Sequence, residues 1–183
     1  MPKNNPRIYR MDVGFVLAIH DELVSRIYPG ADPVEKGALR DRGLLESALS
    51  RPFQSAFGED AYPGILEKAA ALFHSLVANH CFIDGNKRTA VVALQMFLVA
   101  NSIAPLLSDE QIYNVARETA AHTDRGVSAA DTYDEILSTL RAKTVSFAEV
   151  RARKVHDAEF RRIYADLLEA RREYRKEMTA IEP

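Results

Sequence analysis

The sequence predicts an all-α fold with one small hairpin, and three observations support this prediction. Apolar residues recur at three- and four-residue spacings along several segments, as on amphipathic helices. Three patterns of serine followed three residues later by Gln, Asp or Glu resemble capping boxes, which mark helix starts. The stretch over residues 51–64 lacks a helical period and is punctuated like a short flap.

The first 64 residues contain two predicted helices and this flap. Val13 to Tyr28 carries an apolar stripe and ends at Pro29-Gly30, and Gly43 to Ser50 forms a second helix with Asp41 as its N-cap. The flap reads RPFQSAFGEDAYPG, and we expect both of its phenylalanines to be exposed.

Two strongly apolar helices flank a polar segment in the middle of the chain. Ile65 to Asn79 has a broad apolar stripe and ends at His80. The segment TAVVALQMFLVAN is apolar nearly all round, which predicts a central buried helix.

The rest of the chain is expected to be helical as well. The capping patterns begin at Ser108, Ser128 and Ser146, and residues 146 to about 178 read as one long, highly charged helix. Its apolar stripe comprises Phe160, Ile163, Tyr164, Leu167 and Leu168. We therefore divide the chain into a domain at 1–144 and a C-terminal helical extension at 145–183, which packs on the core, pairs with a second copy as a homodimer, or covers the active site as an inhibitor.

Composition excludes several classes of protein. The 24 basic and 26 acidic residues give a net charge of −2, and without a helix-turn-helix signature this argues against direct nucleic-acid binding. The single cysteine, Cys81, excludes an intramolecular disulfide and a cysteine-type zinc site. Because the N-terminus has no signal-peptide core and the longest apolar stretch is too short to span a bilayer, we expect a cytoplasmic protein with no membrane contact.

The polar segment HCFIDGNKR, residues 80–88, brings together groups that suit phosphate chemistry at the start of a buried helix. Such a helix end presents unpaired N–H groups, and Gly85 allows a ligand to approach the backbone. His80 suits a general base, and Asp84 suits Mg²⁺ shared with phosphate oxygens. Each residue alone would be an ordinary cap, turn or surface charge, but the set within nine residues predicts a site.

This segment resembles the signature of the Fic/Doc family, H-P/x-F-x-D-G/A-N-K/G-R. A weaker resemblance extends from about Ile8 to Leu140 and includes HDEL, LLESAL and KAAALFHSLVANH. The resemblance implies a Fic-fold helical bundle with a flap before the motif helix.

Two positions resemble the Doc subgroup rather than the adenylylating Fic enzymes. Lys87 stands where those enzymes have a second glycine, and Val91 stands where they have a second arginine. In Doc-like proteins the nucleotide is understood to bind reversed and to expose its γ-phosphate, so the resemblance implies an ATP-dependent protein Ser/Thr kinase.

The resemblance also implies the roles of the motif residues. His80 would deprotonate the target hydroxyl, and Asp84 would position Mg²⁺ or orient the nucleophile. The nucleotide phosphates of ATP would be held by Gly85, Asn86, Lys87 and Arg88. The flap around Phe53 to Tyr62 would dock an extended target segment or be an ordinary surface loop.

By the same resemblance, the chain would be the toxin of a toxin–antitoxin pair that acts on a translation factor of the elongation factor Tu class. No glutamate is followed by Gly or Asn, so the inhibitory motif S/T-x-x-x-E-G/N is absent, and inhibition would come in trans from a small Phd-like antitoxin. The alternatives are a Fic-type protein adenylyltransferase, which performs AMPylation, and a catalytically silent Fic-fold binding protein.

Three other histidines are assigned structural roles. We expect His20 to serve helix packing or hydrogen bonding, His74 to be structural, and His122 to cap a helix end near Asp124-Arg125.

Overall fold

The computed structural model describes residues 7–27, 39–153 and 158–181, and these residues form a helical fold with three small strand pairs. The all-α class with a small hairpin is therefore confirmed. In chain order the elements are β1 (Ile8–Arg10), α1 (Val13–Ile27), α2 (Arg42–Ser50), the 3-10 helix η1 (Arg51–Phe53), β2 (Ser55–Ala56), β3 (Glu59–Asp60), α3 (Ile65–Ala78), α4 (Asn86–Ala100), β4 (Ile103–Pro105), α5 (Asp109–Ala120), α6 (Ala129–Lys143), β5 (Thr144–Ser146), α7 (Phe147–Arg153), α8 (Ala158–Glu177) and β6 (Thr179–Ile181).

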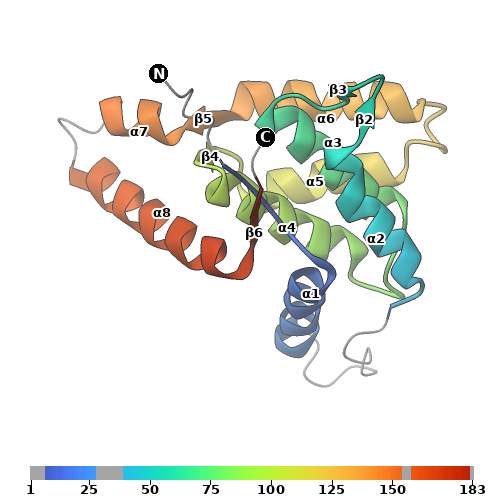
Figure 1. Ribbon diagram of the computed structural model, residues 1–183. Helices are drawn as coiled ribbons and strands as arrows, with labels where there is room; N and C mark the ends of the chain where they lie inside the picture. Colours follow the sequence, from blue (N-terminus) through green and yellow to red (C-terminus); the bar gives the residue numbers. More distant parts are fainter. Residues whose placement is uncertain (1–6, 28–38, 154–157, 182–183) are drawn as a thin grey trace.

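Helix α4 lies at the centre of the molecule, as the sequence predicts for an apolar helix with no polar face. It lies among α1, α3, α5 and α8 and contacts each of them (Figure 1). Most of its residues after Arg88 are buried. Helix α3 packs beside it and is buried continuously from Lys68 to Val77. The two helices on either side of the polar segment thus form the core, and the segment lies where α4 begins.

The predicted helix starts are confirmed by their caps. Asp41 accepts hydrogen bonds from the N–H groups of Gly43 at 2.7 Å and Leu44 at 3.3 Å. Ser108 forms a complete capping box, and Ser128 accepts from the N–H of Asp131. The predicted stop of the first helix at Pro29-Gly30 lies outside the described residues.

The flap is a two-stranded antiparallel hairpin of β2 and β3. Phe57 and Gly58 form its tip with φ values of 55° and 83°, and the Phe57 side chain is fully exposed. The expectation that both phenylalanines are exposed is wrong for Phe53, which packs against the core below the ammonium of Lys68. The Lys68 ammonium also donates to Pro52 O at 3.1 Å and Asp60 Oδ2 at 2.6 Å, so the hairpin is anchored to α3.

Two strand pairs were not predicted. β1 pairs with β6 and β4 pairs with β5, both antiparallel. Strands of three residues are too short to have a readable alternation, and their partners are distant in sequence, so local pattern cannot identify them.

The C-terminal extension is helical as predicted, but it forms two helices, α7 and α8, instead of one. The two helices contact each other and pack on a small apolar cluster whose buried members are Val99, Ala104, Phe147 and Val150. A single straight helix would leave part of this apolar surface in water, so two helices that pack on each other replace the one that was predicted. The side chains of Phe160, Ile163 and Tyr164 lie outside the described residues.

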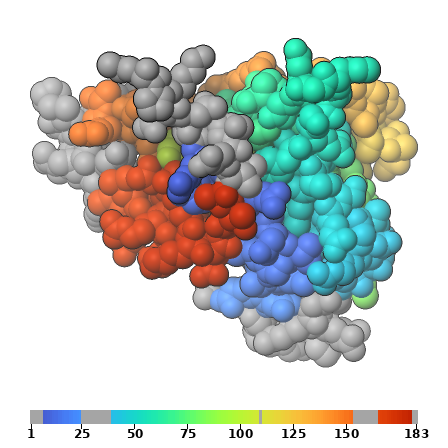
Figure 2. Space-filling view, viewed as in Figure 1, coloured from blue at the N-terminus to red at the C-terminus, as the bar shows by residue number. Residues whose placement is uncertain are grey.

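The extension packs at the C-terminal end of α4. Arg175 donates to Ala100 O at 2.7 Å and Arg171 donates to Ser102 Oγ at 3.0 Å. Figure 2 shows the α8–β6 segment in red beside the blue N-terminal segment, where β6 pairs with β1. The polar segment lies at the opposite end of α4, about 20 Å away by helix geometry, so these contacts favour a packing role over coverage of the site. The predicted domain boundary after residue 144 falls inside β5 and stays a prediction.

None of the described helices is long and apolar enough to cross a lipid bilayer.

Candidate functional site

The loop from His80 to Gly85 joins α3 to α4 and is anchored by Phe82. His80 is exposed and has a φ of 48°, so the chain turns sharply where α3 ends. The side chain of Phe82 is 1% exposed, so it anchors the loop in the core. Its backbone forms a bridge with Leu39, and its ring stacks on His20 with centroids 4.1 Å apart.

Asn86, the first residue of α4, holds the loop in a closed ring. Its amide Oδ1 accepts from the N–H of Phe82 at 2.8 Å, and its Nδ2 donates to Phe82 O at 2.8 Å. The amide that the sequence analysis expected to contact phosphates is therefore engaged within the protein. Its phosphate contact stays a prediction, while its role in shaping the loop is direct.

The N-terminus of α4 is left open by its capping residue. Gly85 occupies the N-cap in the left-handed conformation, with φ 79°, and no side chain caps the helix. A Cβ at Gly85 would lie 3.3 Å from His20 Nε2, so glycine is favoured here by both backbone conformation and space. The first N–H groups of a 15-residue helix are thus available to an anion.

Asp84 is exposed beside this helix end, and its Oδ1 accepts the N–H of Gly85 at 2.6 Å. Among the described residues, no group of three or more His, Cys, Asp or Glu could hold a metal ion. A cation at Asp84 would therefore need further oxygen ligands from water or from a bound phosphate, which is how Mg²⁺ is commonly held.

Two cavities share His80 and Lys87. The smaller, of about 220 Å³, is lined by His80, Asp84, Gly85, Asn86, Lys87, Arg88 and Tyr113. The larger, of about 640 Å³, is lined by His80, Lys87, Asn114, Arg117, Glu118, Ala120, Ala121, Asp124 and Arg125. All six predicted site residues therefore line the smaller cavity. His80 and Lys87 line the larger cavity as well.

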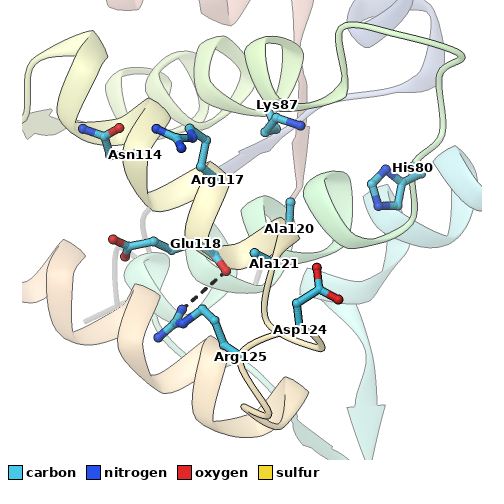
Figure 3. A pocket seen from close by; sticks show the side chains of 9 residues that line it. All are labelled: His80, Lys87, Asn114, Arg117, Glu118, Ala120, Ala121, Asp124 and Arg125. Carbon is cyan, nitrogen blue, oxygen red and sulfur yellow. Dashed lines mark hydrogen bonds between the residues drawn. The ribbon is translucent and has the colours of Figure 1, made fainter.

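The larger cavity has a mixed but cation-rich lining. Figure 3 shows Lys87 on α4, Arg117 on α5 and Arg125 on the following turn around the same space as His80 and Asp124. Arg125 donates to Glu118 O at 3.4 Å and to Glu135 Oε1 at 3.3 Å, so a carboxylate of α6 partly neutralises it. Lys87, Arg117 and the partly neutralised Arg125 face two carboxylates in this lining, those of Glu118 and Asp124. The remaining positive charge near Lys87 and Arg117 can attract an anionic ligand.

Arg117 was not predicted as a site residue, and Arg125 was expected only to lie near a helix end. Asn114, Arg117, Glu118 and Ala121 recur at helical spacing, so the sequence could have placed them on one face of α5. Which face meets the motif loop depends on how α5 packs on α4, and the local pattern does not contain that information.

His20, His74 and His122 have the structural roles that were predicted. His122 Nδ1 bonds to Thr119 O at 2.9 Å at the end of α5, as a cap does. His74 is buried beside Arg51, and burial, together with the charges of Arg51 and His122, lowers its pKa to about 4. His20 is fully buried, and its Nε2 lies 3.1 Å from Asp84 O, so it is bonded to the motif loop itself.

Comparison with known proteins agrees with this geometry. The model of the Fic/DOC family matches residues 10–98, which include α1, α3, the loop and most of α4. A protein named Toxin Doc from Mycolicibacterium smegmatis (strain ATCC 700084 / mc(2)155) is 51% identical over 65 residues. That region is 36% of this chain and 50% of the relative, so the chain matches half the length of this curated relative. No solved structure gives a significant match.

Proposed function

This chain is a member of the Fic/DOC family, and we propose that it is a Doc-like toxin that transfers the γ-phosphoryl group of ATP to a Ser or Thr hydroxyl of a protein. The observation that carries the proposal is the open N-terminus of α4, with His80, Asp84 and Lys87 around one cavity. This set supplies a base, a metal ligand and a phosphate cradle, which are the parts that phosphoryl transfer requires.

The cavities fit a nucleotide. The larger has a volume within the usual range for small-molecule sites, which is about 300–1,000 Å³. The smaller cavity would take the phosphates at the helix N-terminus, with Lys87 and Arg88 beside them. Mg²⁺ bound at Asp84 would supply neutralising charge to the phosphate oxygens.

His80 would act as the general base in this reaction. It would take the proton of the target hydroxyl while the bond from that oxygen to the γ-phosphorus forms. The bond from the γ-phosphorus to the bridging oxygen would break, and ADP would leave with the electron pair. Because His80 is exposed and lines both cavities, a hydroxyl on another protein can reach it.

Lys87 supports phosphate transfer over AMP transfer. Its side chain lines both cavities, so it occupies the space between the loop and α5 where a glycine would leave an opening. Val91 is buried in α4 and offers no second cation to the phosphates of a bound nucleotide. Both features agree with a nucleotide that presents its γ-phosphate.

The target and the inhibitor are further parts of this proposal. The β2–β3 hairpin presents short exposed strands and the exposed Phe57, which suit docking of an extended protein segment. A translation factor of the elongation factor Tu class is the proposed target, and a small Phd-like antitoxin acting in trans is the proposed inhibitor.

The test is incubation of the purified chain with Mg-ATP and a bacterial lysate, followed by intact-mass analysis of the modified proteins. A gain of one phosphate on a translation factor is expected, and His80→Ala should slow it about 10²- to 10⁴-fold. His122→Ala is the matched control, because His122 is half-buried and lines neither cavity.

ATP labelled at the α- or γ-phosphate separates the two transferase activities. Transfer of the γ-label supports the kinase, whereas transfer of the α-label would establish AMPylation and contradict the argument from Lys87. Absence of any transfer by the antitoxin-free protein would favour a silent binding protein.

A further inference from the structure

His20 contacts the loop from His80 to Gly85, although it lies 64 positions before Asp84 in the chain. It is fully buried on α1, and its ring is parallel to that of Phe82 within 4° at a centroid distance of 4.1 Å. Its Nε2 lies 3.1 Å from the carbonyl oxygen of Asp84. The ring thus contacts the loop on both sides of Ile83.

We propose that His20 is a positioning residue, which fixes the peptide between Asp84 and Gly85 and thereby orients the Asp84 carboxylate at the N-terminus of α4. The inference rests on the proposed function for its effect on turnover. The claim that His20 holds the peptide between Asp84 and Gly85 does not depend on that function, and it can be tested without measuring any reaction.

The direction of the hydrogen bond assigns the tautomer. A carbonyl oxygen can only accept, so Nε2 carries the hydrogen and donates to Asp84 O. Nδ1 finds no hydrogen-bond partner among the described residues, although a carboxylate oxygen of Asp21 lies 3.8 Å away. A phenylalanine could form the same stack without burying an unpaired nitrogen, so the bond to Asp84 is what a histidine adds here.

Both ends of one peptide unit are held in this arrangement. The carbonyl oxygen of Asp84 accepts from His20, and the N–H of the same peptide, that of Gly85, donates to Asp84 Oδ1 at 2.6 Å. Because the peptide unit is planar, fixing its oxygen also fixes the direction of its N–H. The position of the carboxylate therefore depends on the bond from His20.

The same peptide unit begins α4. Gly85 is the N-cap, with φ 79°, and the space beside its Cα is closed by His20 Nε2 and Cδ2, at 3.3 and 3.4 Å from an ideal Cβ. His20 thus restricts where the N-cap can move. Loss of the donor should release the peptide while leaving the Asn86 clamp on Phe82 in place.

Two substitutions of His20 distinguish the effect of its hydrogen bond to Asp84 O from the effect of its ring stacking on Phe82. His20→Phe keeps the ring on Phe82 and removes the hydrogen bond, whereas His20→Gln keeps an N–H donor at the same reach and removes the ring. Val16→Ala is the matched control, because Val16 is fully buried on the same helix one turn earlier and should cost stability without altering the loop.

The first measurement is amide hydrogen exchange in the absence of nucleotide. Exchange of the Gly85 N–H should rise about tenfold in His20→Phe, stay near wild type in His20→Gln, and stay near wild type in Val16→Ala. Equal exchange in wild type and His20→Phe would overturn the proposal, whether or not the chain proves to be a kinase.

The second measurement is turnover by the active protein. A misplaced carboxylate should lower kcat about 10- to 100-fold in His20→Phe and raise the Mg²⁺ concentration needed for half-maximal rate, with KM for ATP little changed. His20→Gln should recover most of kcat. A His20→Phe protein with wild-type kcat and Mg²⁺ dependence would refute the positioning role, whereas a wild-type protein without transferase activity would refute only the proposed function.

Discussion

Lowering the pH from 8 to 5 should reduce the free energy of unfolding by about 2 kcal/mol through the protonation of His74. His74 is 3% exposed on α3, and the guanidinium Nη1 of Arg51 lies 3.1 Å from its Nδ1. Arginine can only donate, so Nδ1 is an acceptor and the imidazole is neutral. The pKa of His74 is lowered from 6.5 to about 4, mainly by burial and further by the charges of Arg51 and His122.

The sign follows from proton binding. Between pH 6.5 and 4 the unfolded chain binds a proton at this histidine and the folded protein does not, so acid favours unfolding. The contribution is fully present above pH 6.5 and is lost as the pH falls toward 4. Over the whole interval it amounts to about 3 kcal/mol, of which about 2 kcal/mol is lost by pH 5.

Urea unfolding followed by circular dichroism at pH 8 and pH 5 measures this contribution, with His74→Gln as the reference. A glutamine carbonyl can accept from Arg51 but does not titrate, and the other titrating groups are common to both proteins. The advantage of the wild type over the variant should shrink by about 2 kcal/mol between pH 8 and pH 5. The same difference at both pH values would refute a neutral, buried His74.

Two further predictions concern the flap and the motif loop. Lys68→Met keeps the stem against Phe53 but removes the bonds to Pro52 and Asp60, so proteolysis at the hairpin tip should be about tenfold faster. Lys176→Met, which alters an exposed pair with Glu173, is its control, and equal cleavage of both variants would show that Lys68 does not anchor the hairpin. Cys81 is fully buried, and burial raises its pKa to about 11, so iodoacetamide at pH 8 should label it at least about 10²-fold more slowly in the native protein than in urea. Rapid native labelling would mean that the loop opens readily.

Local sequence was sufficient for most of the helices and for the core. The caps at Asp41 and Ser108 formed as predicted, because capping involves residues only two or three positions apart. Helix α4 is central because it has no polar face to present to water. The break between α7 and α8 was missed, since it depends on a shared apolar cluster that includes residues from α4 and β4.

In the candidate site, too, some features follow from local sequence and others from packing between distant segments. The sequence by itself determined that residues 80–88 form a polar loop before a buried helix, with a base, a carboxylate and two cations in fixed order. Tertiary structure alone decided that Arg117 and Arg125 join Lys87 around one cavity, and that His20 supports Asp84 from below. Helical periodicity shows which residues share a face, but the partner of that face is set by packing between segments far apart in the chain.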